Sequence, residues 1–290
     1  MSGPTLIVLA AGRARRFGGV KPLAPIGANG EAVIDLLAGD AVAAGFERII
    51  LVVNPDSGPL IEAHVAESWP SSVDVRFCIQ DRPLGTVHAV LAARAAADPT
   101  SPFGVANADD LYGLPALRLL AGHLSDAGSN CLVGFRLDRA LVGDDPVTRG
   151  ICEVVDGRLA GIAERREVTA SSGTFSSADG LEPSVLDPEA LVSMNLWGFA
   201  PEMWEVFAEA MGAAVDASED AEVLLPEVVG RIVDGDLAVS PSSLGTFGVL
   251  ATDSICVGVT HPGDLEVVQA DIRSQIERGE RSETPFGDRS

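Results

Sequence analysis

The sequence is poor in positive charge. Its 290 residues include 20 basic and 42 acidic side chains, which gives a formal net charge of −22. A protein that coats nucleic acid needs a basic face to neutralise phosphates, and so few cations cannot form one. We therefore expect no nucleic-acid partner. Lysine is scarcer still, because it occurs once, at Lys21, and every other basic residue is an arginine.

Long apolar runs and paired cysteines are also missing. No apolar stretch approaches the roughly 20 residues that cross a bilayer, and no cleavable leader precedes the first predicted strand. We therefore expect a cytoplasmic protein that does not bind membranes. The four cysteines show no C-x-x-C spacing, so we expect reduced core residues. The four histidines are scattered along the chain, which argues against a zinc site.

Hydrophobic residues make up 47% of the chain, which supports a full core and excludes overall disorder. Up to residue 135, short β-branched runs alternate with segments of helical apolar spacing. This alternation predicts a parallel sheet covered by helices on both faces, with ligands outside the carboxyl ends of its strands. The predicted strands cover 5–9, 48–53, 73–79, 103–106 and 131–135, and the predicted helices cover 32–44, 60–68, 86–97 and 114–127.

The second half of the chain has a different pattern. Asp156-Gly157 predicts a hairpin, and a loop rich in Ser, Gly and Pro is expected over 169–187. No repeat or linker is visible, so we expect a single domain over 1–280, with halves meeting near residue 135, and a disordered tail over 281–290. Further strands are predicted at 150–155, 158–163, 191–199 and near Ala238, Gly248 and Cys256, and further helices at 202–211, 220–233 and 262–277.

Basic residues gather in one glycine-rich segment, LAAGRARRFGGVKPL, between Leu9 and Leu23. Backbone N–H groups freed by glycine, with Arg and Lys around them, form a phosphate cradle. The pattern LAAG-x-x-x-R-F-G-G-x-K-P resembles the signature loop of the sugar-nucleotide pyrophosphorylases, which are nucleotidyltransferases. The family usually has Gly where this chain has Ala14, and Ser or Thr where it has Arg15.

The resemblance implies a fold and a set of roles. The fold is α/β, a Rossmann-like three-layer αβα arrangement with a mostly parallel mixed sheet, similar to that of GT-A proteins. The half over 1–135 binds the nucleotide and the half over about 136–265 binds the sugar. Arg16 and Lys21 are catalytic, because they neutralise charge on the triphosphate. The residues expected to line the triphosphate are Leu9, Ala10, Ala11 and Gly12.

A second motif, QDRPLGTVHAV, follows the third predicted strand. Gln80 offers an amide donor and acceptor to a base edge, and Gly85 lets a flat ring approach the backbone. Thr86 can cap the following helix while it faces the ligand. The segment is similar to Q-x-x-x-LGT-x-x-A of the bacterial uridylyltransferases. That resemblance assigns Gln80, Gly85 and Thr86 to nucleotide binding and favours uracil.

A third motif, VANADDLYG, places two carboxylates after an apolar strand, at the same sheet edge. Mg²⁺ takes hard oxygen ligands, commonly one or two carboxylates together with phosphate oxygens. The resemblance makes Asp109 the catalytic metal ligand and Asp110 its neighbour, with Mg²⁺ as the cofactor. A second ligand comes from the C-terminal region in the family, where Asp253 and Asp264 are the candidates in this chain.

The sugar side is spread along the sequence. Gly150, Glu164 and Asn195 match, by resemblance to the N-acetylglucosamine 1-phosphate uridylyltransferases, positions that face the sugar. A carboxylate and an amide are suited to binding hydroxyl groups. Arg165 or Arg166 is a candidate for holding the sugar phosphate, because a guanidinium binds phosphate through paired hydrogen bonds.

These motifs together predict a Mg²⁺-dependent nucleotidyltransferase that joins a sugar 1-phosphate to a nucleoside triphosphate, with UTP favoured, and releases pyrophosphate. A cytidylyl- or guanylyltransferase acting on another phosphorylated acceptor or on a molybdopterin would use the same loop. A glycosyltransferase of the same fold is disfavoured by Lys21, because those enzymes lack the Arg/Lys loop. A non-catalytic module that senses a nucleotide sugar stays open, and so does the oligomeric state.

Overall fold

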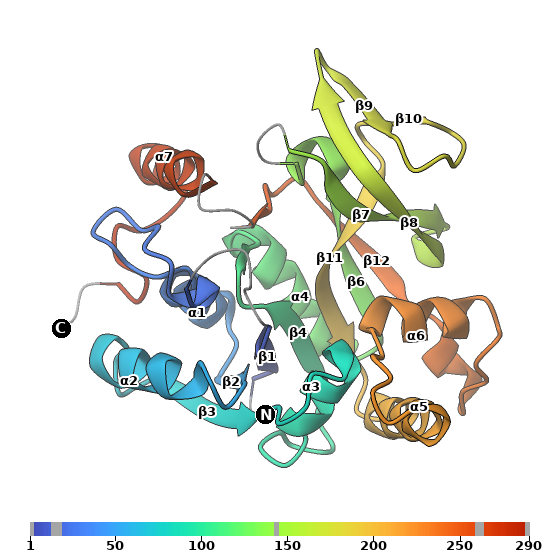
Figure 1. The fold of residues 1–290 in the computed structure, drawn as a ribbon. Helices are drawn as coiled ribbons and strands as arrows, with labels where there is room; N and C mark the ends of the chain where they lie inside the picture. Colours follow the sequence, from blue (N-terminus) through green and yellow to red (C-terminus); the bar gives the residue numbers. More distant parts are fainter. Residues whose placement is uncertain (1–2, 13–18, 142–144, 259–263, 288–290) are drawn as a thin grey trace.

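A twisted sheet passes through the centre of the protein (Figure 1). The computed structural model describes residues 3–12, 19–141, 145–258 and 264–287. Seven strands form the middle of the sheet, and both halves of the chain contribute to them. In spatial order they are β3 (Asp74–Ile79), β2 (Arg48–Val53), β1 (Thr5–Ala10), β4 (Phe103–Asn107), β11 (Leu191–Phe199), β6 (Cys131–Arg136) and β12 (Gly248–Thr252).

Strand direction in this central part follows the alternation in the sequence. β1 pairs in parallel with β2 and β4, β2 with β3, and β6 with β12. β11 is inserted between β4 and β6 and runs antiparallel to both. The Rossmann-like α/β class with a mostly parallel mixed sheet is therefore confirmed.

Helices cover both faces, which explains why strands such as RIILVV in β2 are continuously apolar. In β1, Leu6 and Val8 pack into one core while Ile7 packs into the other. The first core contains α1 (Val33–Ala44), α2 (Gly58–Ser68), α4 (Leu114–Asp126) and α7 (Asp264–Glu277). The second contains α3 (Gly85–Ala93), α5 (Met203–Ala217) and α6 (Leu225–Val233).

An antiparallel arm extends the sheet and projects from the body of the molecule (Figure 1). Asp156 and Gly157 both have positive φ, as the predicted hairpin turn requires. The prediction of a loop over 169–187 is wrong in part, because β8 continues into it and two short strands lie within it. The arm consists of β7 (Val147–Val155), β8 (Arg158–Ser171), β9 (Thr174–Ser177) and β10 (Val185–Leu186).

Short elements complete the chain. β5 (Asp110–Leu111) pairs with β13 (Val257–Gly258) in a separate two-stranded sheet. The strand predicted near Ala238 is absent from the described residues, where this position is coil. Among the residues with described coordinates, no helix is long and apolar enough to cross a membrane. The 3₁₀ turns are η1 (Lys21–Leu23), η2 (Leu137–Arg139) and η3 (Ser242–Gly245).

The C-terminal segment after α7 packs on α1 and α2. The Arg281 guanidinium bonds both oxygens of Asp40, at 3.0 and 2.7 Å, and the Phe286 ring lies 5.5 Å from that of Trp69. A side chain at Gly39 would collide with the backbone of Pro285. The sequence favours a disordered tail over 281–290, whereas 281–287 form these contacts.

Candidate active site

A cavity of about 540 Å³ opens at the carboxyl ends of β1, β3 and β4, the edge where the sequence places a nucleotide. The segments that follow these three strands converge there because parallel strands end on the same side of a sheet. Six residues predicted for the nucleotide and the predicted metal ligand line it. The full lining is Leu9, Ala11, Gly12, Gln80, Pro83, Gly85, Thr86, Ala89, Asn107, Asp109, Glu222 and Leu224.

The start of the glycine-rich loop is fixed by its neighbours. The Asn54 side-chain amide donates to the Ala11 carbonyl at 3.1 Å, and the Ala108 backbone N–H donates to the Leu9 carbonyl at 3.2 Å. Asn54 was not predicted as a site residue. Its place directly after β2, at the same sheet edge, is the signal that could have identified it.

Lys21 and Asp109 face each other beside this loop. Lys21 Nζ lies 3.6 Å from Asp109 Oδ2, and their side chains are 20% and 37% exposed. A smaller cavity of about 120 Å³ lies between the loop and these two residues, and Leu9, Ala10 and Gly12 also line it. Arg16, the other predicted catalytic residue, lies outside the described residues.

Asp110 belongs to a polar cluster behind Asp109. The Asn107 amide donates to Asp110 Oδ2 at 2.9 Å, and Tyr112 accepts from the Asn107 backbone and donates to the Met194 carbonyl. Burial raises the pKa of Asp110 to about 7, and the Asp109 carboxylate adds to the shift. Asp110 is therefore poorly suited to carry a full negative charge beside Asp109.

Asp109 has the chemistry expected of a ligand for the predicted Mg²⁺. Its carboxylate is part-exposed at the cavity edge, and Mg²⁺ commonly takes one or two carboxylates and completes its shell with phosphates and water. No group of three or more His, Cys, Asp and Glu side chains that could hold a metal exists in the described part of the chain. Asp253 is exposed and lines neither main cavity, and the Asp264 side chain lies outside the described residues.

Gln80 is buried and lines the first cavity. Its Nε2 donates to the Gly85 carbonyl at 3.0 Å and lies 3.3 Å from His88 Nδ1. The amide nitrogen is thus used to hold the Gly85 turn, and Oε1 is the atom that can accept a hydrogen bond from a base. The prediction that Thr86 caps its own helix is wrong, because α3 begins at Gly85 and the Thr86 hydroxyl accepts from Leu225 N at 2.8 Å.

A second cavity, of about 620 Å³, adjoins the first, and Thr86 and Leu224 line both. It contains all three residues predicted for the sugar. That α6 forms a wall of this cavity was not predicted from the sequence, because the two walls come from distant segments. The lining is Thr86, Thr148, Gly150, Ile162, Glu164, Ser193, Asn195, Leu224, Pro226, Glu227, Gly230, Arg231 and Asp234.

Asn195 occupies an unusual backbone position. Its φ is +58°, and the register between β11 and β6 shifts between Ser193 and Trp197. Asn tolerates this left-handed conformation better than most residues, and such bulges redirect side chains near functional sites. The Trp197 indole N–H donates to Asn195 Oδ1 at 3.3 Å, which leaves the amide NH₂ free for a ligand.

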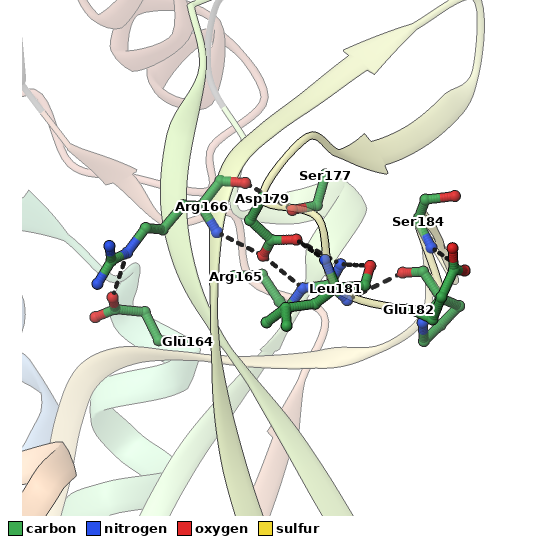
Figure 2. Close-up of polar contacts among 9 residues, drawn as sticks. Glu164, Arg165, Arg166, Ser177, Asp179, Leu181, Glu182 and Ser184 are labelled. Carbon is green, nitrogen blue, oxygen red and sulfur yellow. Dashed lines mark hydrogen bonds and ion pairs between the residues drawn. The ribbon is translucent and has the colours of Figure 1, made fainter.

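Arg165 is not available to a sugar phosphate, so this prediction is wrong. Its guanidinium forms two bonds to Asp179, at 2.8 and 3.0 Å, and others to the Pro183 and Leu181 carbonyls (Figure 2). Both side chains are buried, and the hydrogen bonds from Arg165 hold the pKa of Asp179 well below its usual range. The pair therefore anchors the turn that joins β9 to β10.

Arg166 points to the other side of β8, where its Nε lies 3.0 Å from Glu164 Oε1 (Figure 2). Glu164 lines the second cavity, but Arg166 does not. An exposed pair of this kind contributes little stability. The pair does restrict the position of the Glu164 carboxylate, which is predicted to bind the sugar.

Known proteins resemble this chain in sequence and in fold. The bifunctional protein GlmU of Rhodopseudomonas palustris is 31% identical over 260 residues, which are 88% of this chain and 55% of that protein. The chain spans 34% to 55% of the length of the curated relatives it matches.

Two solved structures share the fold. The inositol-1-phosphate CTP transferase of T. maritima has a TM-score of 0.65 and 16% identity, with 96% of this chain and 98% of that chain covered. HddC of Yersinia pseudotuberculosis complexed with GMP-PN has a TM-score of 0.60 and 19% identity, with 92% and 99% covered. The model of the MobA-like NTP transferase domain matches residues 6–167, more than half of the sequence. The chain belongs to the MobA-like NTP transferase family.

Proposed function

We propose that the protein is a sugar-1-phosphate nucleotidyltransferase that uses UTP and Mg²⁺. The observation that carries the proposal is the pair of adjoining cavities at the carboxyl edge of the sheet, which share Thr86 and Leu224. One cavity contains the phosphate loop and Asp109, and the other contains Glu164 and Asn195. Two substrates held in these cavities would meet where the cavities adjoin, and Asp109, with Lys21 Nζ 3.6 Å away, lies at the first of them.

In the proposed reaction, an oxygen of the sugar phosphate attacks the α-phosphorus of the nucleotide. The new O–Pα bond forms as the bond between Pα and the bridging oxygen breaks, and pyrophosphate leaves with the electron pair. The attacking phosphate is already an anion near neutral pH, so no general base is needed. Catalysis then depends on positioning and on charge neutralisation.

The residues divide this work by position. Leu9 to Gly12 hold the phosphates through backbone N–H groups, and Lys21 stabilises the charge that develops on the α-phosphate and on pyrophosphate. Glu164 and the amide of Asn195 bind sugar hydroxyls. Asp109 would hold Mg²⁺, which supplies positive charge to the phosphate oxygens when bound.

The base is assigned to uracil on the Gln80 motif. With its amide nitrogen bonded to the Gly85 carbonyl, Gln80 Oε1 can accept from uracil N3–H. Cytosine can also donate to this oxygen, through its amino group. The fold relatives include a CTP transferase and a protein complexed with GMP-PN, so the test must compare all four bases.

The test is pyrophosphate release with Mg²⁺, across four nucleoside triphosphates and a panel of sugar 1-phosphates, with each product identified by mass. A UDP-sugar is the expected product. A CDP- or GDP-linked product would overturn the base assignment but keep the reaction class. Nucleotide-sugar binding without any turnover would favour the sensing module instead.

A further inference from the structure

The turn that carries Gly85 is joined directly to the segment that enters α6. Val223 N donates to the Leu84 carbonyl at 3.0 Å, and Val87 N donates to the Val223 carbonyl at 3.1 Å. The Thr86 hydroxyl accepts from Leu225 N at 2.8 Å. Three hydrogen bonds thus connect two segments that are nearly 140 residues apart in sequence.

Gly85 makes this close approach possible. Its φ is +90°, and a Cβ placed on it would lie 2.3 Å from the Val223 carbonyl oxygen and 2.6 Å from Val223 N. No side chain fits there, because these are backbone atoms that cannot move independently. The two segments are therefore in direct backbone contact.

This contact lies where the two cavities adjoin. Gly85 lines the first cavity, proposed for the nucleotide, and α6 contributes Glu227 and Arg231 to the second, proposed for the acceptor. Thr86 and Leu224 line both. The first N–H groups of a helix have no partner within the helix, and an oxygen that accepts from one of them fixes the helix start. For α6 that oxygen comes from Thr86, on the wall of the nucleotide cavity.

We propose that Thr86 is a positioning residue that makes binding of the acceptor depend on the nucleotide. A base packed on Gly85 braces the turn over residues 84–87, and the Thr86–Leu225 bond transmits this restraint to α6. The nucleotide and the acceptor then each bind more tightly when the other is present, by the same factor. This coupling rests on the proposed function, because it takes the second cavity to be the acceptor site.

The matched variants are Thr86→Val and Thr86→Ser. Valine keeps the shape of the side chain but leaves Leu225 N without its acceptor, whereas serine keeps the oxygen. We expect Thr86→Val to remove the coupling, so that the KM of each substrate, measured at a saturating concentration of the other, rises about tenfold, and Thr86→Ser to restore both values. A partial loss of folded protein alone would lower kcat and leave both KM values unchanged.

Thr252→Val is the control. Thr252 is buried, and its hydroxyl, like that of Thr86, accepts from a backbone N–H, that of Ser254, at 3.1 Å, but Thr252 lines neither main cavity. We expect both KM values to be unchanged. An acceptor KM raised equally in Thr252→Val would assign the effect to general destabilisation and overturn the proposal.

Calorimetry tests the coupling without turnover. The probes are glucose 1-phosphate and α,β-methylene UTP, which cannot release pyrophosphate. Each is titrated alone and with the other present, in the wild type and in both variants. Coupling in the wild type that is lost in Thr86→Val and kept in Thr86→Ser supports the proposal, even if no sugar phosphate gives a product.

The remaining outcomes would overturn the proposed coupling. Product formation with neither KM changed by Thr86→Val, or with only one of them changed, overturns the coupling while the proposed function stands. Independent binding of the two probes in the wild type overturns it as well. If the wild type forms no product and binds neither probe, the proposed function fails, and the coupling fails with it.

Discussion

The indole N–H of Trp197 donates to Asn195 Oδ1, at 3.3 Å, across the bulge in β11. The bond fixes which end of the Asn195 amide faces the acceptor cavity, because the oxygen is taken and the NH₂ group is left. A fully buried tryptophan thus takes part in a site that it does not line. The effect of this hydrogen bond on acceptor binding can be tested directly.

Trp197→Phe should weaken acceptor binding. Phenylalanine keeps an aromatic ring in the core but cannot donate to Asn195, so the amide is free to rotate. We expect the acceptor KM to rise about five- to tenfold while the nucleotide KM stays constant. Trp204→Phe is the matched control, because the Trp204 indole is also buried and has no hydrogen-bond partner within the described part of the chain. Equal KM values in the two variants would contradict the role.

Lys21→Ala should lower kcat about 10²- to 10³-fold, the range seen when one group that stabilises transition-state charge is removed. Lys21 is part-exposed, so the melting temperature should hardly change. Lys21→Arg should restore little activity, because a planar guanidinium does not replace a compact ammonium at a phosphate. The measurement is single-turnover product formation, and a near-normal rate in Lys21→Ala would remove this residue from catalysis.

Asp109→Asn should abolish the dependence of the rate on Mg²⁺. The neighbouring Asp110→Asn is the control. Burial raises the pKa of Asp110 to about 7, so this carboxyl is about half protonated near neutral pH, and an amide resembles a protonated carboxyl. The apparent Mg²⁺ constant from rate titrations should therefore change in the first variant and stay close to the wild-type value in the second. The opposite ranking would place the metal on Asp110.

The sequence predicted the parts of the fold that local patterns determine. β2 and β11 begin and end where predicted, because each is an apolar run between turn residues. Leu9, Gln80 and Asp109 were expected to meet, and they line one cavity, since each lies at or just after the carboxyl end of a parallel strand. The rule that parallel strands end at the same edge of a sheet was sufficient to predict that these residues lie together.

Contacts between distant segments were not predictable in this way. Nothing around Arg165 indicates that Asp179 will neutralise it, because the partner lies 14 residues away in the turn between β9 and β10. Glu222 and Arg231 were missed for a similar reason, since α6 and the segment before it reach the site through the Gly85 contact. The sequence shows which side chains have the right chemistry, whereas the packing determines which of them are free to use it.

Asp179→Asn should make the protein less sensitive to acid. The hydrogen bonds from Arg165 hold the pKa of Asp179 below its usual range, so the pair adds stability above the pKa of the unfolded chain and loses it as pH falls. The wild type should therefore be the more stable protein at about pH 6, and its advantage should shrink towards about pH 3. Thermal unfolding at several pH values measures this.

Glu280→Gln is the comparison for that experiment. Its carboxylate also bonds an arginine, Arg278, but both side chains are about half exposed. Exposed pairs contribute little because water and salt screen them. If the wild type is more stable than Glu280→Gln by the same amount and with the same pH dependence, burial of the Asp179 pair is irrelevant.

Arg281→Gln should destabilise the contact between the C-terminal segment and α1. The Asp40 and Arg281 side chains are 13% and 6% exposed, and removing one partner of a buried pair costs about 3 kcal/mol. Burial raises the pKa of Asp40, and Arg281 opposes that shift, so the variant should raise this pKa further. A raised carboxyl pKa costs stability as pH rises, because the folded state holds the proton more tightly.

The deficit of Arg281→Gln should therefore be largest near about pH 8 and smaller near about pH 4.5, where Asp40 takes up a proton. Urea unfolding at the two pH values gives both free energies. Arg278→Gln, in the same segment but exposed, should show little change at either. A deficit that does not depend on pH would mean that Arg281 acts through packing alone. Only an effect on the charge of Asp40 would make the loss of stability change as this carboxylate gains a proton.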